Sequence, residues 1–145
     1  LFCFLDQKAL APLGDLSLSD FERTLQERFP CETSIDDFIQ RLSFDLNKET
    51  PLNKLSGGEN QMAKLAAHFY CKCSHRFLDE PTNHLDQARL LKLKDFLMAL
   101  KSQGTSFVII DHDMNFLKGL CDEFLTLDFE KKLLIPKDSE AIDGV

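Results

Sequence analysis

The sequence predicts an α/β fold in which a parallel sheet adjoins a small helical subdomain. After residue 55, apolar segments of strand length alternate with segments of helical periodicity, which is typical of a parallel sheet with helices on its faces. Before that point, two helical patterns follow each other without a strand between them. Hydrophobic residues make up 43% of the 145 residues and charged residues 28%, with only six Gly and five Pro, so a folded core is expected.

The composition argues against several classes of function. The net charge is −7 and there is no Lys- and Arg-rich block, which disfavours unaided nucleic-acid binding. No apolar run approaches the ~20 residues of a transmembrane segment, and residues 1–5 lack the basic lead and cleavage pattern of a secretory signal. The cysteines have no paired spacing, which indicates reduced thiols and a cytoplasmic protein; they are Cys3, Cys31, Cys71, Cys73 and Cys121.

The first elements follow from apolar spacing and capping residues. Residues 1–5 predict a strand that starts at the first position. Ser19 and Glu22 have the spacing of a capping box at the start of one helix, and Ser34 precedes a second helical pattern. Residues 46–54 contain Asn and Pro, which are typical of a loop.

The second half of the chain predicts alternating helices and strands. Gly104 ends one of the helices, and short apolar runs bounded by polar residues mark the strands. The expected helices cover residues 59–71, 87–101 and 114–121, and the expected strands cover residues 77–78, 107–110, 124–127 and 133–135.

Residues 56–59 have the pattern of a helix start that is open to an anion. Ser56 and Glu59 fit a capping box, and the two glycines between them leave backbone N–H groups uncovered. Free N–H groups and the positive end of the helix dipole suit a phosphate group. The alternative is an ordinary helix cap after a turn.

Two adjacent carboxylates, Asp79 and Glu80, follow a buried strand, where ligands of parallel sheets bind. One carboxylate can hold Mg²⁺ while the other polarises a nucleophilic water. His112 follows the next strand and is expected at the same edge of the sheet. The alternatives are an acidic turn and a hydrogen-bonded surface histidine.

Together these segments resemble the nucleotide-binding domain of the ATP-binding cassette (ABC) superfamily. Residues 55–61 look like the signature sequence, residues 77–80 like the Walker B strand, residues 83–86 like the D-loop and His112 like the switch histidine. Residues 4–7 resemble the strand and glutamine of the Q-loop. The D-loop region most resembles the ABC-F subfamily, whose members are soluble proteins with two cassettes that act on ribosomes.

The resemblance implies a P-loop NTPase-like core and a division of the chain into three parts. These are a Q-loop strand at about residues 1–7, a helical subdomain with the signature helix at residues 15–72, and the Walker B and switch half of the core at residues 73–145.

In the family, ATP and Mg²⁺ bind between two cassettes that face each other head to tail. The resemblance implies that one cassette acts on its own ATP through Gln7 (magnesium and attacking water), Asp79 (magnesium), Glu80 (general base) and His112 (γ-phosphate). It implies that a partner cassette's ATP is bound by Ser56, Gly57, Gly58 and Glu59, and that Asp86 couples the two sites.

Three departures from the family pattern affect these expectations. The phosphate-loop pattern G-x-x-x-x-G-K-[ST] does not occur, so we interpret the chain as the C-terminal part of a cassette, inactive alone. This interpretation predicts a bare sheet edge where the missing strands would pair and a partly uncovered apolar face at residues 107–110. His75 and Arg76 stand where a Walker B strand is apolar, which predicts a shorter or more exposed strand. Asp111 replaces a small hydroxyl residue and is expected near the polyphosphate, where it would weaken nucleotide binding.

Three functions are therefore open. The first is part of an ABC-F-like ATPase, whose partners would be ATP, a second cassette and the ribosome. The second is a degenerate, non-catalytic cassette that lends its signature helix to an intact one. The third is the ATP-binding subunit of a membrane ABC transporter.

Overall fold

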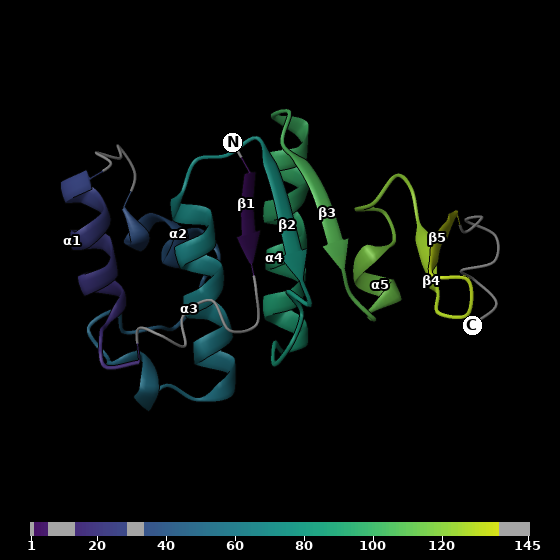
Figure 1. Cartoon of the computed structure of the whole chain (residues 1–145). Helices are drawn as coiled ribbons and strands as arrows, with labels where there is room; N and C mark the ends of the chain where they lie inside the picture. The colour runs from purple at the N-terminus through teal and green to yellow at the C-terminus, as the bar shows by residue number, and fades with distance from the viewer. Residues whose placement is uncertain (1, 6–13, 29–33, 137–145) are drawn as a thin grey trace. The chain divides into compact units, whose positions relative to one another are not determined.

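The computed structural model describes residues 2–5, 14–28 and 34–136, which belong to two compact units, Leu1–His112 and Asp113–Val145 (Figure 1). The first unit contains strands β1 (Phe2–Leu5), β2 (His75–Asp79) and β3 (Ser106–Ile110). Its helices are α1 (Leu18–Arg28), α2 (Ile35–Arg41), α3 (Gly57–Tyr70) and α4 (Gln87–Ser102), with a 3-10 turn, η2, at Leu52–Lys54.

The three strands of this unit form a parallel sheet in the order β1-β2-β3. Phe4 pairs with Phe77, and Asp79 pairs with Ile110 at the carboxyl end of the sheet. This arrangement confirms the expected parallel α/β fold. Each strand of the trio is separated from the next along the chain by helices, as parallel connections require.

Helix α3 is central to the packing of the first unit. It contacts α1, α2 and β1, and nine of its fourteen positions are apolar or aromatic residues or glycine. The Phe69 ring lies 4.8 Å from that of Phe96 on α4, and Phe38 on α2 lies 6.3 Å from Phe96. Full burial of each such ring contributes about 1.5–3 kcal/mol to stability, so these aromatic contacts hold three helices together.

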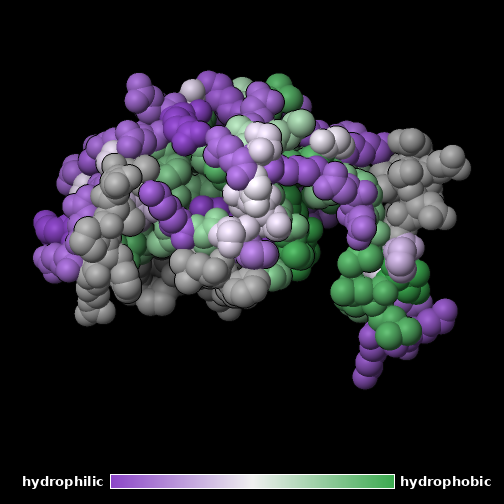
Figure 2. All heavy atoms as spheres, turned by 90° about the horizontal axis from the view of Figure 1, so that it is seen from above, coloured by the Kyte–Doolittle hydropathy of each residue, from purple (hydrophilic) through white to green (hydrophobic). Residues whose placement is uncertain are grey.

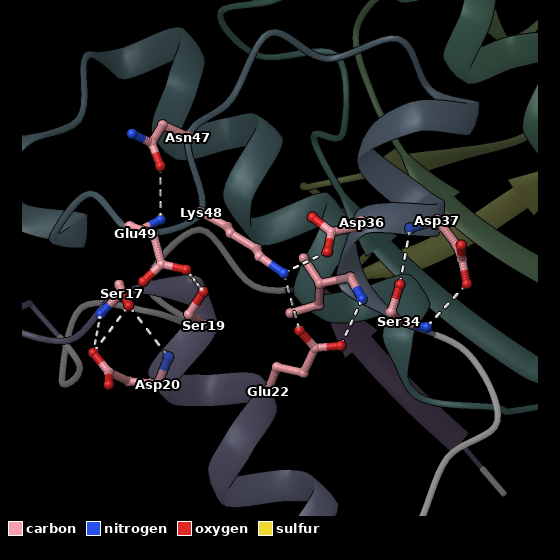
Figure 3. Close-up of polar contacts among 11 residues, drawn as sticks. Ser17, Ser19, Asp20, Glu22, Ser34, Asp36, Asp37, Asn47, Lys48 and Glu49 are labelled. Carbon is pink, nitrogen blue, oxygen red and sulfur yellow. Dashed lines mark hydrogen bonds and ion pairs between the residues drawn. The ribbon is translucent and has the colours of Figure 1, made fainter.

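The start of α1 differs from the predicted one. The structure places the reciprocal cap at Ser17 and Asp20: Asp20 Oδ2 accepts from the Ser17 N–H at 3.0 Å, and Ser17 Oγ accepts from the Asp20 N–H at 3.2 Å (Figure 3). Ser19 lies inside the helix, and Glu22 instead accepts a hydrogen bond of 2.9 Å from the Ile35 N–H. The Ser19–Glu22 cap was therefore a wrong prediction, whereas the helix itself is confirmed.

Ser34 precedes helix α2 as predicted and is its N-cap, with a capping box completed by Asp37. Lys48 then joins the helices, because its ammonium group contacts Asp36 on α2 and lies 3.8 Å from Glu22 Oε2 on α1 (Figure 3). The hydrogen bond to Asp36 raises the pKa of Lys48 above its ordinary value. The loop after α2 is thereby fastened to both helices.

Strand β2 is neither shortened nor wholly exposed by its basic residues. His75 is exposed, but Arg76 is only 5% exposed. The Arg76 guanidinium donates to the carbonyls of His68 at 3.0 Å and Cys71 at 2.9 Å, and it lies over the Phe69 ring. These carbonyls close the C-terminal end of α3, where a helix favours positive charge. The two terminal nitrogens of Arg76 are therefore paired, whereas its buried Nε has no hydrogen-bond partner among the described residues.

Strand β3 is one of the two edges of the sheet within the described residues. Its partner there is β2, and Val108 and Ile110 are 52% and 64% exposed. The expected partial exposure of this apolar strand is confirmed. Such an edge offers unpaired backbone groups to another strand.

The second unit contains the short helix α5 (Met114–Leu117) and a hairpin of β4 (Leu125–Asp128) and β5 (Leu133–Pro136). The antiparallel pairing of Leu127 with Leu134 confirms the expected strand pair. The helix ends four residues earlier than predicted because Lys118 is extended and Gly119 has a φ of 76°. The hairpin exposes several large apolar side chains, which appear as green spheres at the right of Figure 2.

Among the described residues, we find no helix with both the length and the apolar character needed to cross a membrane.

Candidate functional site

The carboxyl ends of β2 and β3 bring the predicted acidic residues and histidine to one edge of the sheet. Asp79 is in register with Ile110, and the Glu80 N–H donates to the Ile110 carbonyl at 2.7 Å. Asp111 and His112 follow directly, so they lie at the same strand ends as Asp79 and Glu80. The His112 side chain is 75% exposed and is accessible to a ligand.

Glu80 has an unusual backbone conformation. Its φ is +47°, in the left-handed region that costs a residue with a side chain about 1–3 kcal/mol. Its carboxylate accepts a hydrogen bond of 2.8 Å from the Asn83 side chain, and its carbonyl accepts one of 3.3 Å from the Gln61 side chain. Backbone and side chain of Glu80 are therefore both held by neighbouring groups.

The turn after β2 is fastened to β3 by Thr82 and Asp111. The Thr82 hydroxyl lies 2.8 Å from both carboxylate oxygens of Asp111, and the Thr82 N–H donates to Oδ2 at 3.2 Å. The Asp111 side chain is fully buried. The Asp111 carboxylate is therefore engaged by Thr82, and its expected place near a polyphosphate stays a prediction.

The predicted capping box at the start of α3 is present. Ser56 Oγ accepts from the Glu59 N–H at 3.3 Å, and Glu59 Oε2 accepts from the Ser56 N–H at 2.8 Å. The bond from the Ser56 backbone, followed by that from its side chain, holds the pKa of the Glu59 carboxyl below its ordinary value. The Glu59 carboxylate therefore acts as part of the cap.

The two glycines at the start of α3 lie against the turn that follows Glu80. A Cβ at Gly58 would lie 3.2 Å from the His84 carbonyl oxygen, which is tighter than ordinary contact. A Cβ at Gly57 would lie 3.5 Å from His84 Nδ1, at ordinary distance. His84 itself has a φ of +61°. The start of the predicted signature helix and the predicted D-loop thus touch within one chain.

Two predicted site residues remain, Asp86 and Gln7, and the structure describes the first of them. Asp86 is the N-cap of α4: its Oδ1 accepts from the Arg89 N–H at 2.9 Å, and its Oδ2 lies 3.4 Å from the Arg89 guanidinium. Gln7 lies outside the described residues. The described residues contain no group of three or more potential metal ligands.

Sequence reasoning missed Gln61. Its side chain is buried and donates to the carbonyls of Glu80 and Pro81, at 3.3 Å and 3.0 Å. The available signal was its position four residues after Gly57, which places both on one face of the helix.

The fold defines the class of the protein as an α/β domain with a P-loop NTPase-like parallel sheet. The family model described as "ABC transporter" matches residues 7–83, more than half of the chain. The chain therefore belongs to the ABC transporter family, which confirms the resemblance seen in the sequence.

The relatives are much longer than this chain. It is 32% identical over 129 residues to the ATP-binding protein Uup of Buchnera aphidicola. This match covers 86% of the chain and 21% of Uup. It is 34% identical over 97 residues to elongation factor 3 of Mycosarcoma maydis, which covers 67% of the chain and 9% of that protein.

A solved structure shows the same fold. It is that of the complex of the archaeal ribosomal stalk protein aP1 and the archaeal ribosome recycling factor aABCE1, with a TM-score of 0.71 at 23% identity. The match covers 86% of this chain and 24% of that one. At this level of identity the likeness concerns the fold alone.

Proposed function

We propose that the chain is the segment of an ABC ATPase that carries the catalytic carboxylates and the signature helix. The observation that supports this most strongly is the bond from the Glu80 N–H to the Ile110 carbonyl, at 2.7 Å. It gathers Asp79, Glu80 and His112 at adjacent strand ends, where ligands of parallel sheets bind.

At this edge each side chain has a proposed task. Asp79 would hold Mg²⁺, because Mg²⁺ in nucleotide sites takes one or two carboxylates together with phosphate oxygens. Glu80 is the general base that accepts a proton from the attacking water. His112, which is well exposed, donates a hydrogen bond to the γ-phosphate. Gln7 completes the set by contacting the magnesium and the water.

The start of α3 is proposed to bind ATP that belongs to a second cassette. Ser56 and Gly57 are exposed there, and the positive end of a fourteen-residue helix favours a phosphate. Gly58 and Glu59 shape the same helix start. Asp86, as the cap of the next helix, couples the two sites through the D-loop.

Three parts of the cassette are assigned in this proposal: the Q-loop strand at residues 1–7, the helical subdomain at 15–72, and the Walker B and switch half of the core at 73–145. The phosphate loop must come from outside these residues, because the sequence contains none. Turnover therefore requires a complete cassette, by which we mean this chain joined to a segment with a phosphate loop.

A role in translation in the cytoplasm is proposed on the basis of the relatives. Elongation factor 3 is among the relatives of the chain, at 34% identity over 97 residues. The ribosome is accordingly the proposed large partner, with ATP as ligand and a second cassette as the closest protein partner.

The test compares Glu80→Gln with Glu27→Gln, an exposed control on α1, in a complete cassette. Glu80→Gln should lower ATP turnover about 10²–10⁴-fold and leave ATP binding intact, because it removes only the base. Asp79→Asn should instead weaken binding that depends on Mg²⁺. Unchanged turnover in Glu80→Gln would contradict the catalytic assignment.

The alternatives give different results in the same assay. A degenerate cassette would tolerate Glu80→Gln but would lose stimulation of its intact partner when Gly57 is changed. A transporter subunit would hydrolyse ATP but would sediment with a membrane protein rather than with ribosomes.

A further inference from the structure

Gln61 connects the predicted signature helix to the backbone of the predicted general base. Its side chain is only 6% exposed, and its amide nitrogen donates to the carbonyl of Glu80 at 3.3 Å and to that of Pro81 at 3.0 Å. A side-chain amide nitrogen carries two hydrogens, so these two bonds use both of them. The contact joins α3 to a turn about twenty residues further along the chain.

The turn that receives these bonds is held in an unfavourable conformation. Glu80 has a φ of +47° and His84 a φ of +61°, and neither residue is glycine. Such backbone persists only where surrounding contacts over-determine it, and it is concentrated at functional sites. The contacts at Glu80 include the bond to the Ile110 carbonyl, the Asn83 side-chain amide on the carboxylate, and the Asn83 N–H and Gln61 side-chain amide on the carbonyl.

We propose that Gln61 is a positioning residue that fixes the left-handed backbone of Glu80 and thereby couples the signature helix to the general base of the same cassette. This inference rests on the proposed function, which makes Glu80 the base. Without the Gln61 amide, the peptide after Glu80 turns toward an ordinary backbone conformation. The carboxylate then moves away from the position that Asn83 now gives it.

A second contact links α3 to the same turn. Gly57 and Gly58 lie against His84, so the start of α3 touches the far end of the turn while Gln61 holds its beginning. A shift of α3 when it meets a partner's ATP would therefore reach the turn at two points. Glu80 would respond to the nucleotide bound by the neighbouring cassette as well as to its own.

The first test is native-state hydrogen exchange on the 145-residue chain with Gln61→Met, which keeps the side-chain length and removes the donors. The Asn83 and Leu85 amides, which bond to the carbonyls of Glu80 and Thr82 at 3.2 Å each, should exchange about tenfold faster. The Phe21 amide in α1 should not change. Gln40→Met, an exposed change on α2, is the matched control.

A purely structural role for Gln61 gives a different pattern. Loss of general stability would accelerate exchange at Phe21 as much as at Asn83 and Leu85, and that result would overturn the proposal. No acceleration at Asn83 and Leu85 would overturn it equally.

The second test uses a complete cassette and separates kcat from KM. Gln61→Met should lower kcat about 10–10²-fold and leave the KM for ATP unchanged, because it misplaces the base without touching nucleotide-binding groups. If Glu80→Gln abolishes turnover but Gln61→Met keeps the wild-type kcat, the positioning role of Gln61 is wrong while the proposed function stands. If Glu80→Gln keeps turnover, the proposed function fails, whatever exchange shows at Asn83.

Discussion

Replacement of Gly57 with Asp is expected to stabilise the fold while it weakens ATP-dependent pairing with a second cassette. Gly57 is the first residue of α3, and an added Cβ would meet the His84 ring at an ordinary 3.5 Å. A residue other than glycine loses less conformational entropy on folding, which stabilises the helix by about 0.5–1 kcal/mol. A carboxylate in the first turn stabilises it by a further amount of about 0.3–1 kcal/mol through the helix dipole. The free energy of unfolding should therefore rise by about 1 kcal/mol.

Pairing should change in the opposite direction. In the proposed arrangement Gly57 lies against the γ-phosphate of the partner's ATP, so its replacement by Asp brings two negative charges together. At 4 Å, two unit charges repel by about 1 kcal/mol in water and about 4 kcal/mol near a protein surface. Since 1.4 kcal/mol corresponds to a factor of ten, association should weaken by at least about fivefold.

Urea unfolding of the chain measures the first effect. Sedimentation of a complete cassette with and without ATP, in a Glu80→Gln background that prevents turnover, measures the second. Gly57→Asn is the control, because it has the same shape without the charge and should pair more tightly than Gly57→Asp. Equal pairing of Gly57→Asp and the parent protein would refute the placement of α3 against a phosphate, and a loss of stability would refute the local geometry.

Three further outcomes are expected. The chain alone should release no phosphate from ATP in the presence of Mg²⁺, and a rate that Glu80→Gln removes would contradict this. Ser56→Ala should lower the free energy of unfolding by about 0.5–2 kcal/mol, the usual cost of a lost N-cap. Because the folded protein holds the pKa of Glu59 below its ordinary value, the contribution of that carboxylate is present above the unfolded pKa and is lost as pH falls through the folded one. Unfolding at a series of acidic pH values should then show the gap between Glu59→Gln, which lacks the carboxylate, and the parent protein closing, and a constant gap would refute the linkage. The apolar edge strand β3 should bind a hydrophobic dye and promote self-association of the chain. Ile110, which is 64% exposed, lies on this strand, so Ile110→Lys should reduce both dye binding and self-association without unfolding the chain. Unchanged sedimentation of the variant would show that another surface is responsible.

The sequence was most informative where the structural signal is local. The reciprocal bonds of the α3 cap join residues three apart, so the pattern of Ser56 and Glu59 predicted them. At α1, two such patterns overlap, two residues apart, and local spacing does not choose between them. The structure selects Ser17 as the cap, which frees Glu22 to accept the bond from Ile35 on α2. A contact between helices therefore decided where a helix begins.

In the candidate site, too, local features could be predicted and contacts between distant residues could not. The meeting of Asp79, Glu80 and His112 followed from the rule that parallel strands end at one edge, so it could be predicted. The bonds from Gln61 and between Thr82 and Asp111 join residues about twenty to thirty positions apart, and no periodicity identifies such partners. The burial of Asp111 in particular could not be predicted, because it depends on where the turn at Thr82 folds back.

Helix α3 is attached to β2 at two points, and this attachment gives the proposed site its geometry. Near its C-terminal end, the carbonyl of His68 accepts a bond from Arg76 inside the strand. Near its start, Gln61 donates to the carbonyls that follow Asp79. A helix held at both ends cannot tilt or slide without moving the strand. The surface proposed to meet a partner's ATP is thus fixed relative to the carboxylates proposed to act on the chain's own ATP. The basic residue that departs from the family pattern, Arg76, contributes one of these two attachments.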